Sequence, residues 1–342
     1  MWQIVDQTPF SADGTFVRDG SGFEHWVVAL RATFRINDNG FVSIDEDQKP
    51  VCRSSVYAER DGEADHEELR VDTDFSPFRP KVDVTIGGQV VAPNGKPFQE
   101  QPFEVSIGSF KKPGVAFAPR EMKHASRGWQ VEANEQTEAV ELSWRNAIGG
   151  KDAFGGSETH PTNPIGKGWF ASKQSISRDM QLELPQIEDP ANRFKQIDKI
   201  PTPVGFGAVA RAWSPRRERA GTYDDEWEED RAPLAPLDFS DRFHQAAPDD
   251  QVLDLRGGER VSIIGLHPEG PYEFVLPQII LEAQTHINRR KPIQRLRLIA
   301  VHIDASGKRL SMVWNTSLPC NGLEQVLDRS TVWVKQMAGV AK

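Results

Sequence analysis

A run of carboxylates between residues 224 and 230 is the most prominent group of chemically active side chains in the sequence. Acidic side chains in this number could bind calcium or supply an acid and a base for catalysis. The run consists of Asp224, Asp225, Glu226, Glu228, Glu229 and Asp230. A calcium loop alternates its oxygen ligands around a glycine turn, whereas these acids are consecutive, flank Trp227 and are followed by no glycine. The pattern favours a short helix or turn that exposes its charges and buries Trp227.

Other motifs that could support catalysis or cofactor binding are incomplete. The sequence has no Gly-x-Ser-x-Gly motif, which argues against a serine hydrolase. Residues 147–152 contain a Gly-Lys pair, but Asp152 follows Lys151, so the phosphate-binding loop is broken. The acidic residues 65–68 lack the second histidine of a zinc protease helix and favour a solvated charged loop. The sequence therefore predicts no catalytic, cofactor-binding or metal-binding residues.

The overall charge and the cysteine content restrict the class of protein further. The chain has 50 acidic and 41 basic side chains, and its formal net charge of -9 argues against a nucleic-acid partner. Cys52 and Cys320 lack the paired spacing of a zinc or redox motif, so we expect two buried thiols. We expect a cytoplasmic protein with no membrane partner. The reason is that the N-terminus lacks a secretion signal and no apolar run approaches the roughly 20 residues of a membrane span.

The clearest structural element is the segment 26–36, where apolar and more polar residues alternate. One face of this predicted strand carries Trp26, Val28, Leu30, Ala32, Phe34 and Ile36. We expect the opposite face to become solvated after its first residues, because it carries Arg31 and Arg35. Alternating runs recur over 81–91, 103–107 and 140–144, with a turn at 93–96 that can accept positive φ. These patterns predict an antiparallel β unit over residues 1–145.

The rest of the chain divides into two parts. In residues 146–255 Gly and Pro recur every few residues, yet many aromatic side chains need burial. We expect an ordered, irregular region packed on the sheets, with one short helix after Asp189-Pro190. Within residues 256–342, alternating runs return over 261–266, 272–276, 279–287, 296–303 and 309–314, with a hairpin loop between the last two and Gly307 at its strained position. The sequence predicts an all-β, mainly antiparallel fold of two β-sandwich-like units joined by the irregular region, or one domain containing all three.

Three stretches together carry a resemblance to a known family. The first comprises Thr8-Pro9-Phe10, Phe16-Val17-Arg18-Asp19 and the strand 26–36, and the second is Asn163-Pro164-Ile165-Gly166-Lys167-Gly168. The third and most specific contains Pro203-Val204-Gly205-Phe206-Gly207, Trp213-Ser214-Pro215-Arg216, Gly221-Thr222-Tyr223-Asp224 and Gln245-Ala246-Ala247-Pro248-Asp249-Asp250-Gln251. Over nearly its whole length the chain resembles a bacterial family of unknown-function domains encoded beside type VI secretion spike genes.

The resemblance implies a non-enzymatic adaptor or chaperone with no cofactor. Such a protein would hold a secreted effector, or its PAAR-type tip domain, in the cytoplasm and load it onto the trimeric VgrG spike. The family brings no catalytic residues. Two other functions stay open at this point: a β-sandwich enzyme acting on carbohydrate, and a structural subunit of the secretion particle.

We expect the segment 213–251 to form the partner-binding surface. It concentrates aromatic and arginine side chains, which dominate the energetics of protein interfaces, beside blocks of opposite charge. The candidate contact residues are Trp213, Arg216, Arg217, Tyr223, Asp224, Asp225, Trp227, Arg231, Phe239 and Phe243. The same aromatic side chains could instead fix the segment to its own sheets.

Overall fold

The computed structural model describes residues 2–58, 67–126, 128–172 and 180–341. Strands make up 44% of the chain and helices 8%, and most strand pairs are antiparallel. The all-β prediction is therefore confirmed. Within the described ranges, no helix has the length and apolar character needed to cross a membrane.

The largest sheet has seven strands and draws them from both ends of the chain. Its order is β18 (Val252–Leu253), β7 (Val82–Gly87), β23 (Arg297–Asp304), β24 (Arg309–Pro319), β3 (Glu24–Ile36) and β2 (Ser11–Arg18), with β4 (Val42–Ile44) also paired to β3. β7 and β23 pair in parallel, and their neighbours are antiparallel. Because β7 precedes β23 by more than 200 residues, this pairing holds the two ends of the chain in one sheet.

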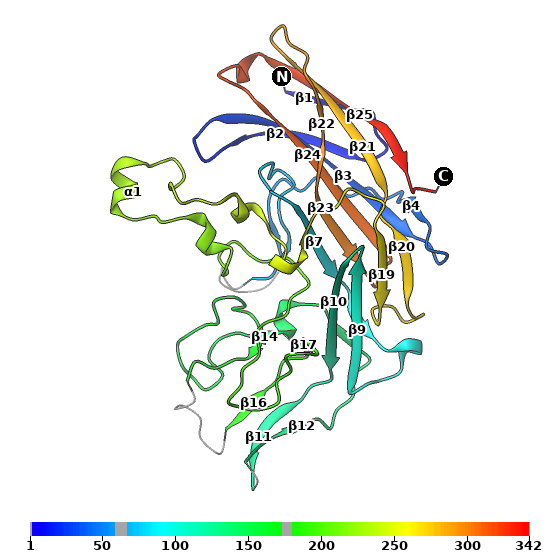
Figure 1. Cartoon of the computed structure of the whole chain (residues 1–342), viewed down its shortest axis with the longest axis vertical. Coiled ribbons are helices and arrows are strands. Elements are labelled where there is room, and N and C mark those ends of the chain that lie inside the picture. The colour runs from blue at the N-terminus through cyan, green and yellow to red at the C-terminus, as the bar shows by residue number, and fades with distance from the viewer. Residues whose placement is uncertain (1, 59–66, 127, 173–179, 342) are drawn as a thin grey trace.

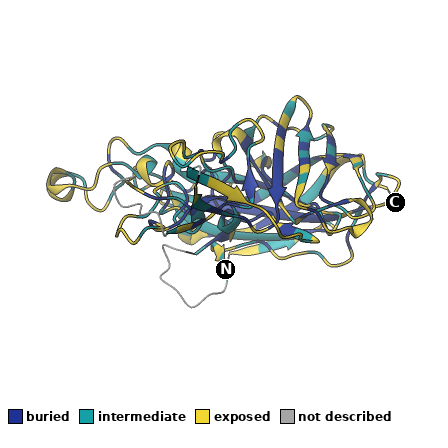
Figure 2. Cartoon of the chain, turned by 90° about the horizontal axis from the view of Figure 1, so that it is seen from below, coloured by how far each residue is buried: buried dark blue, intermediate teal, exposed yellow. Residues whose placement is uncertain are grey.

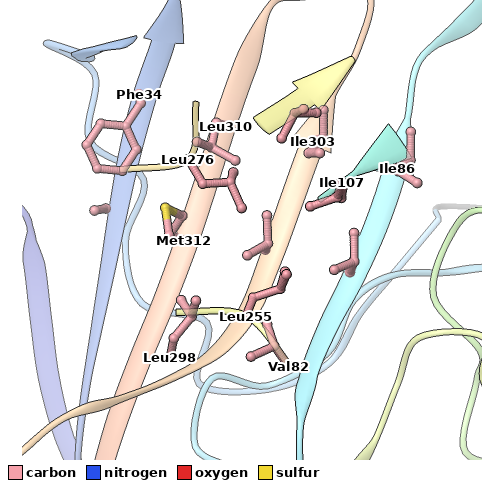
Figure 3. Close-up of a cluster of buried hydrophobic side chains, with 14 of the residues drawn as sticks. Phe34, Val82, Ile86, Ile107, Leu255, Leu276, Leu298, Ile303, Leu310 and Met312 are labelled. Atoms are coloured by element: carbon pink, nitrogen blue, oxygen red, sulfur yellow. The ribbon is translucent and has the colours of Figure 1, made fainter. Parts of the chain in front are cut away.

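Two further sheets share an apolar core with the largest one. The first contains β1 (Gln3–Asp6), β25 (Leu327–Ala338), β21 (Gln278–Ile287) and β22 (Ile293–Arg295). The second contains β17 (Ile187–Glu188), β10 (Phe110–Phe117), β9 (Glu100–Ile107), β19 (Arg260–Ile264) and β20 (Tyr272–Val275). Side chains from the three sheets, including Phe34, Ile107, Leu281 and Ile303, pack in a single buried cluster. Figure 3 shows part of it.

Smaller elements build the rest of the molecule. The remaining strands are β5 (Val56–Tyr57), β6 (Leu69–Val71), β8 (Gln89–Val91), β11 (Glu121–Ala125), β12 (Gly128–Glu132), β13 (Ala139–Glu141), β14 (Ile148–Gly149), β15 (Lys167–Gly168) and β16 (Gln181–Glu183). The one α-helix of the described residues is α1 (Asp225–Asp230). Short 3-10 helices cover Pro93–Gly95, Trp144–Asn146, Arg217–Ala220, Asp241–His244, Asp249–Gln251 and Glu324–Val326. The irregular middle of the chain has its own apolar cluster, with Phe170 and Phe194 packed on Met122 of β11.

The face of β3 that we expected to be solvated is mostly covered. Val51 and Phe75 pack against its first residues, Val27 and Ala29. Arg31 is buried as well, and its Nε and Nη2 atoms donate to the two carboxylate oxygens of Asp74 at 2.9 and 2.7 Å. The bidentate partner makes burial of the guanidinium tolerable. The predicted solvent exposure is therefore wrong at Arg31, whereas Arg35 is exposed as expected.

The predicted helix after Asp189-Pro190 does not form. The Asp189 carboxylate accepts from the N–H of Ala191, and its carbonyl accepts from Asn192, which makes a single turn. The next turn is lost because the N–H of Phe194 donates to the buried carboxylate of Glu188 at 3.0 Å, not to a helical carbonyl. A local tertiary bond thus overrides the capping signal.

The loop after β23 is a hairpin loop, but its strained residue differs from the predicted one. Lys308 has φ of 47°, whereas Gly307 lies outside the positive-φ region. At Gly307 a Cβ would lie 2.2 Å from Oδ2 of Asp304, so a larger residue there would require the Asp304 side chain to move. The prediction of buried thiols is right for Cys320 and wrong for Cys52, which is half-buried.

The charged segment 65–68 is also only partly as expected. Asp65 and His66 lie outside the described residues. Glu68 is buried, because its carboxylate accepts from the hydroxyl of Ser143 at 2.9 Å and from the N–H of Trp144 at 3.0 Å. A solvated loop is therefore the wrong description of Glu68.

Candidate partner-binding surface

The segment 213–251 is fixed to the body of the protein by buried polar side chains. The central one is Arg216, whose Nη2 atom lies 2.5 Å from Oδ2 of Asp72, with both side chains almost fully enclosed. Its Nε and Nη1 atoms donate to the carbonyls of Phe243 and Val209 at 2.8 and 2.9 Å. Arg216 thereby joins the two ends of the segment to a carboxylate that lies next to β6.

Asp72 is surrounded by three guanidinium groups. Nη2 of Arg79 lies 3.5 Å from its Oδ2 atom, and Nη2 of Arg211 lies 3.4 Å from its Oδ1 atom. Burial alone would raise the pKa of Asp72, but the charges of Arg216, Arg79 and Arg211 outweigh burial and hold that pKa well below its usual range. Asp72 is therefore ionised at any physiological pH.

A second set of contacts connects the end of the segment to β7. Nε2 of Gln245 donates to Oδ1 of Asp83 at 2.5 Å, and the N–H of Ala246 donates to Oδ2 at 2.8 Å. Nε2 of Gln251 donates to the carbonyl of Val84 at 2.7 Å, while its Oε1 accepts from Nζ of the buried Lys112 at 2.7 Å. The side chains of Asp83, Lys112, Gln245 and Gln251 are all buried, so losing any of these hydrogen bonds would be costly in free energy.

We refer to Trp213, Arg216, Gln245 and Gln251, with their carboxylate partners Asp72 and Asp83, as the anchor. The indole of Trp213 meets that of Trp144 edge to face, with ring centroids 5.9 Å apart. Trp213 and Arg216 are therefore interior residues. Neither side chain reaches the surface, so the structure gives both residues a supporting position, and their predicted role in partner binding stays a prediction.

Between the two halves of the anchor the chain leaves the body of the molecule. Residues 221–240, which we call the finger, carry α1 and lie at one side of the protein, away from the sheets (Figure 1). Oδ1 of Asp224 accepts from the N–H of Trp227 at 3.0 Å and so caps the helix. The Trp227 indole donates from Nε1 to the carbonyl of Leu234 at 2.9 Å and meets the ring of Tyr223 at 4.7 Å. The finger is thus held together locally around Trp227.

The neck of the finger is closed by a carboxylate clasp. Thr222 donates its N–H and its hydroxyl to the two carboxylate oxygens of Asp238, at 3.0 and 2.8 Å. These bonds lower the pKa of Asp238. Gly221 has φ of 85° and leaves room for the clasp, because a Cβ would lie 2.7 Å from Oδ1 of Asp238. In the C-terminal half of the finger, the N–H of Ala235 donates to the carbonyl of Gly20, which lies in the turn between β2 and β3.

The finger exposes both charge and apolar area. It holds seven carboxylates and one guanidinium, a formal net charge of -6 against -9 for the whole chain. Leu237 is 88% exposed and Tyr223 56%, and Phe23 in the adjoining β2–β3 turn is 66% exposed. Figure 2 shows α1 as an exposed end of the molecule. Large apolar side chains grouped within an acidic surface are the composition of an interaction site.

The predicted contact residues therefore separate into three groups. Trp213 and Arg216 are buried. Arg217, Tyr223, Asp224 and Asp225 are exposed. Trp227, Arg231, Phe239 and Phe243 are half-buried. Arg231 bonds within the finger, to the carbonyl of Ala235, and the rings of Phe239 and Phe243 pack on each other at its base. The predicted helix with exposed charges is confirmed by α1.

The sequence interpretation missed the carboxylate half of the anchor. Asp72 and Asp74 stand in the run 69–76, where Leu69, Val71 and Phe75 alternate with polar residues that include both acids. This alternation places the acids on the polar face of the run, so the local pattern gives no signal that they are buried. Their partners could not be read from spacing, since Arg216 lies 144 residues from Asp72.

The described residues contain no group of three or more His, Cys, Asp or Glu side chains arranged to hold a metal ion.

A comparison with family models matches residues 21–315 to the family described as "Uncharacterized protein conserved in bacteria (DUF2169)". Comparisons with curated proteins and with solved structures gave no match. Because the family model covers most of the chain, the protein belongs to the DUF2169 family.

Proposed function

We propose that this member of the DUF2169 family is a non-enzymatic adaptor that presents the finger to a partner protein. In this proposal the adaptor acts in the cytoplasm of a bacterium with a type VI secretion system. It holds a secreted effector, or its PAAR-type tip domain, and delivers it to the VgrG spike. The resemblance described above supplies the secretion system and the partners, and the finger supplies the contact surface.

The observation that carries the proposal is the contrast between a rigid base and an exposed tip. Leu237 and Tyr223 are largely exposed, so their apolar area contributes little to the stability of the fold. The base of the finger is nevertheless held in one position by a buried ion pair. A pre-positioned surface lowers the entropic cost of association, and exposed aromatic and aliphatic side chains are the usual anchors of an interface. The arrangement is suited to binding a partner.

The charge of the finger indicates the chemistry of that partner. Six carboxylates within residues 224–230 would repel an acidic surface and attract a basic one over distances near the Debye length. We therefore expect a basic rim around an apolar pocket on the partner, with Leu237 and Tyr223 entering the pocket and the carboxylates of α1 facing the rim.

The enzyme hypothesis has less support. A cavity of about 370 Å³ lies at the base of the finger, and four of its charged lining groups form two ion pairs with one another. Nζ of Lys112 contacts the Asp250 carboxylate at 2.8 Å, and Nη2 of Arg219 contacts that of Asp249 at 2.5 Å. Carboxylates that neutralise neighbouring cations are poorly placed to serve as a general acid and a base.

The proposal is tested by co-purification of the effector, the PAAR-type domain and the VgrG spike of the same bacterium. We expect Glu228→Lys with Glu229→Lys to abolish capture, because the two substitutions make the net charge of α1 less negative by four. The matched control is Glu135→Lys with Glu138→Lys, which makes the same change at exposed carboxylates on another surface. Full capture by the α1 variant, or equal loss in the control, would remove the finger from the proposal. Turnover of a polysaccharide by the purified protein would favour an enzyme.

A further inference from the structure

The strand β22 forms a free edge of the four-stranded sheet. Among the residues that the structure describes, it pairs only with β21, and the sheet ends there. The N–H of Thr285 donates to the carbonyl of Pro292, and the N–H of Leu296 donates to that of Leu281. Because antiparallel strands alternate the direction of their backbone groups, the N–H and C=O groups of Ile293 and Arg295 point away from β21. Such an edge is a template for another strand.

The chain around this edge is strongly basic in a protein that is acidic overall. Residues 289–297 hold five cationic side chains and no carboxylate. Within the described part of the chain, none of these five side chains forms an ion pair with a carboxylate. The same is true of Arg256, which lies nearby. Arg297 donates to the carbonyls of Pro77 and Arg79, which fixes its position without neutralising it. The carboxylate opposite Arg295 on β21, that of Glu282, is paired with Lys335.

A cavity of about 490 Å³ adjoins the edge. Its apolar lining comes from Leu255, Ile279, Leu296, Leu298 and Trp314. Its three charged lining residues, Arg256, Arg295 and Arg297, are all cations. Leu255 and Leu298 lie beside each other at the border of the main core in Figure 3. Ile293 is 56% exposed and shares a face of β22 with Arg295, because side chains two residues apart on a strand point the same way.

We propose that this edge binds an extended acidic segment of another protein as an additional strand. Backbone groups of the segment would pair with Ile293 and Arg295, alternate apolar side chains would enter the cavity, and its carboxylates would meet Arg256, Arg295 and the cations of the β21–β22 turn. An acidic partner is favoured because, among the described residues, six cations on or near this edge have no carboxylate partner and three of them line the cavity. The surface is separate from the finger, so this inference does not depend on the proposed function.

The test uses a labelled synthetic peptide of alternating glutamate and valine, with a lysine and valine peptide as its counterpart, and fluorescence anisotropy as the measurement. We expect the acidic peptide to bind and the basic one not to bind. Arg256→Glu with Arg295→Glu should weaken binding by at least about tenfold, because like charges at an interface are repulsive. Lys96→Glu with Arg217→Glu, at exposed cations outside this sheet, is the matched control and should keep binding.

A second variant tests strand addition itself. Ile293→Pro removes an N–H that points away from β21, so an edge strand tolerates it while losing one bond to the peptide. Ile293→Thr keeps that N–H. We expect weakened binding for the proline variant and near-normal binding for the threonine variant. If the proline variant does not fold, the arginine variants and their control decide the question alone.

Several results would overturn the inference. These are full binding by the arginine variants, equal loss in the control, and full binding by a folded Ile293→Pro protein. Tighter binding of single-stranded DNA or of anionic lipid vesicles, lost in the arginine variants, would assign the edge to a different class of ligand. Self-association that disappears in those variants would assign it to a second copy of this chain.

Discussion

The anchor and the finger lie in one continuous stretch of sequence but treat polar and apolar side chains in opposite ways. In the anchor, Arg216 and Gln251 are buried and bonded. In the finger, Leu237 and Tyr223 are exposed and the carboxylates of α1 face solvent. A buried charge that loses its partner destabilises the fold by several kcal/mol, whereas an exposed charge contributes little to stability. The difference teaches that one recognisable stretch of sequence can hold both interior residues, such as Arg216, and exposed ones, such as Tyr223.

The largest expected effect is the loss of Arg216. We expect Arg216→Ala to lower the free energy of unfolding by roughly 3–5 kcal/mol, because Asp72 and two carbonyls lose a buried partner. The neighbouring Arg217→Ala is the control, since this side chain is exposed and should change stability by less than about 0.5 kcal/mol. Urea unfolding measures both. Equal effects for the two arginines would contradict the distinction between anchor and surface.

The next effect is a pH dependence centred on His244. Burial, then the charges of Arg79, Arg211 and Arg216, lower its pKa to about 4. The unfolded chain takes up this proton near pH 6.5, so it binds more protons than the folded protein between pH 6.5 and about 4. Stability should therefore fall as the pH is lowered through this window, by roughly 2–3 kcal/mol from this group.

The contribution of His244 can be isolated with His244→Gln. Thermal melts of the variant between pH 7 and pH 4 should show a shallower decline than those of the wild type. His302 has a lowered pKa too and adds a dependence of the same sign, which the variant retains. Parallel curves for the two proteins would mean that His244 is solvated and that the base of the finger is open.

A smaller and local effect is expected for Trp227→Ala. Its ring contact with Tyr223 and its bond to Leu234 lie within the finger, so their loss should loosen residues 221–240 and leave the sheets intact. Limited proteolysis should cut the variant faster in the finger, while the main melting transition moves by only a few degrees. A large drop in the main transition would show that the finger is part of the core.

The smallest effect on stability is expected for Glu228→Ala with Glu229→Ala. Both side chains are exposed and lie within α1. Removing two like charges from a dense acidic helix should change the free energy of unfolding by less than about 0.5 kcal/mol. Differential scanning calorimetry checks this value. A marked loss of stability would give these carboxylates a structural role.

Much of the β-structure could be predicted because alternation reports a strand with one buried face. The run 26–36, the run 81–91 and the run 279–287 all correspond to strands. The strand β25 escaped prediction although it has 12 residues, because polar side chains stand at most of its outward positions and Ser330 is buried within it. There Ser330 accepts a hydrogen bond from the indole of Trp26, a partner that the sequence does not indicate.

The candidate site could be predicted only in part for a related reason. The composition of α1 identified an exposed acidic helix, because that property is local. Whether Arg216 or Arg217 is buried depends on Asp72, which is distant in sequence. Adjacent arginines look equivalent in a sequence, and only the tertiary partner separates a structural arginine from a surface one.

The most direct test of the finger as a contact surface is the affinity of the purified protein for the proposed effector, measured by isothermal titration calorimetry. The variant is Tyr223→Ala with Leu237→Ala, and the matched control is Ile264→Ala with Val275→Ala, which are exposed apolar side chains on β19 and β20. We predict a loss of roughly tenfold or more for the finger variant, an unchanged melting temperature, and normal affinity for the control. Normal affinity of a folded finger variant would contradict the account.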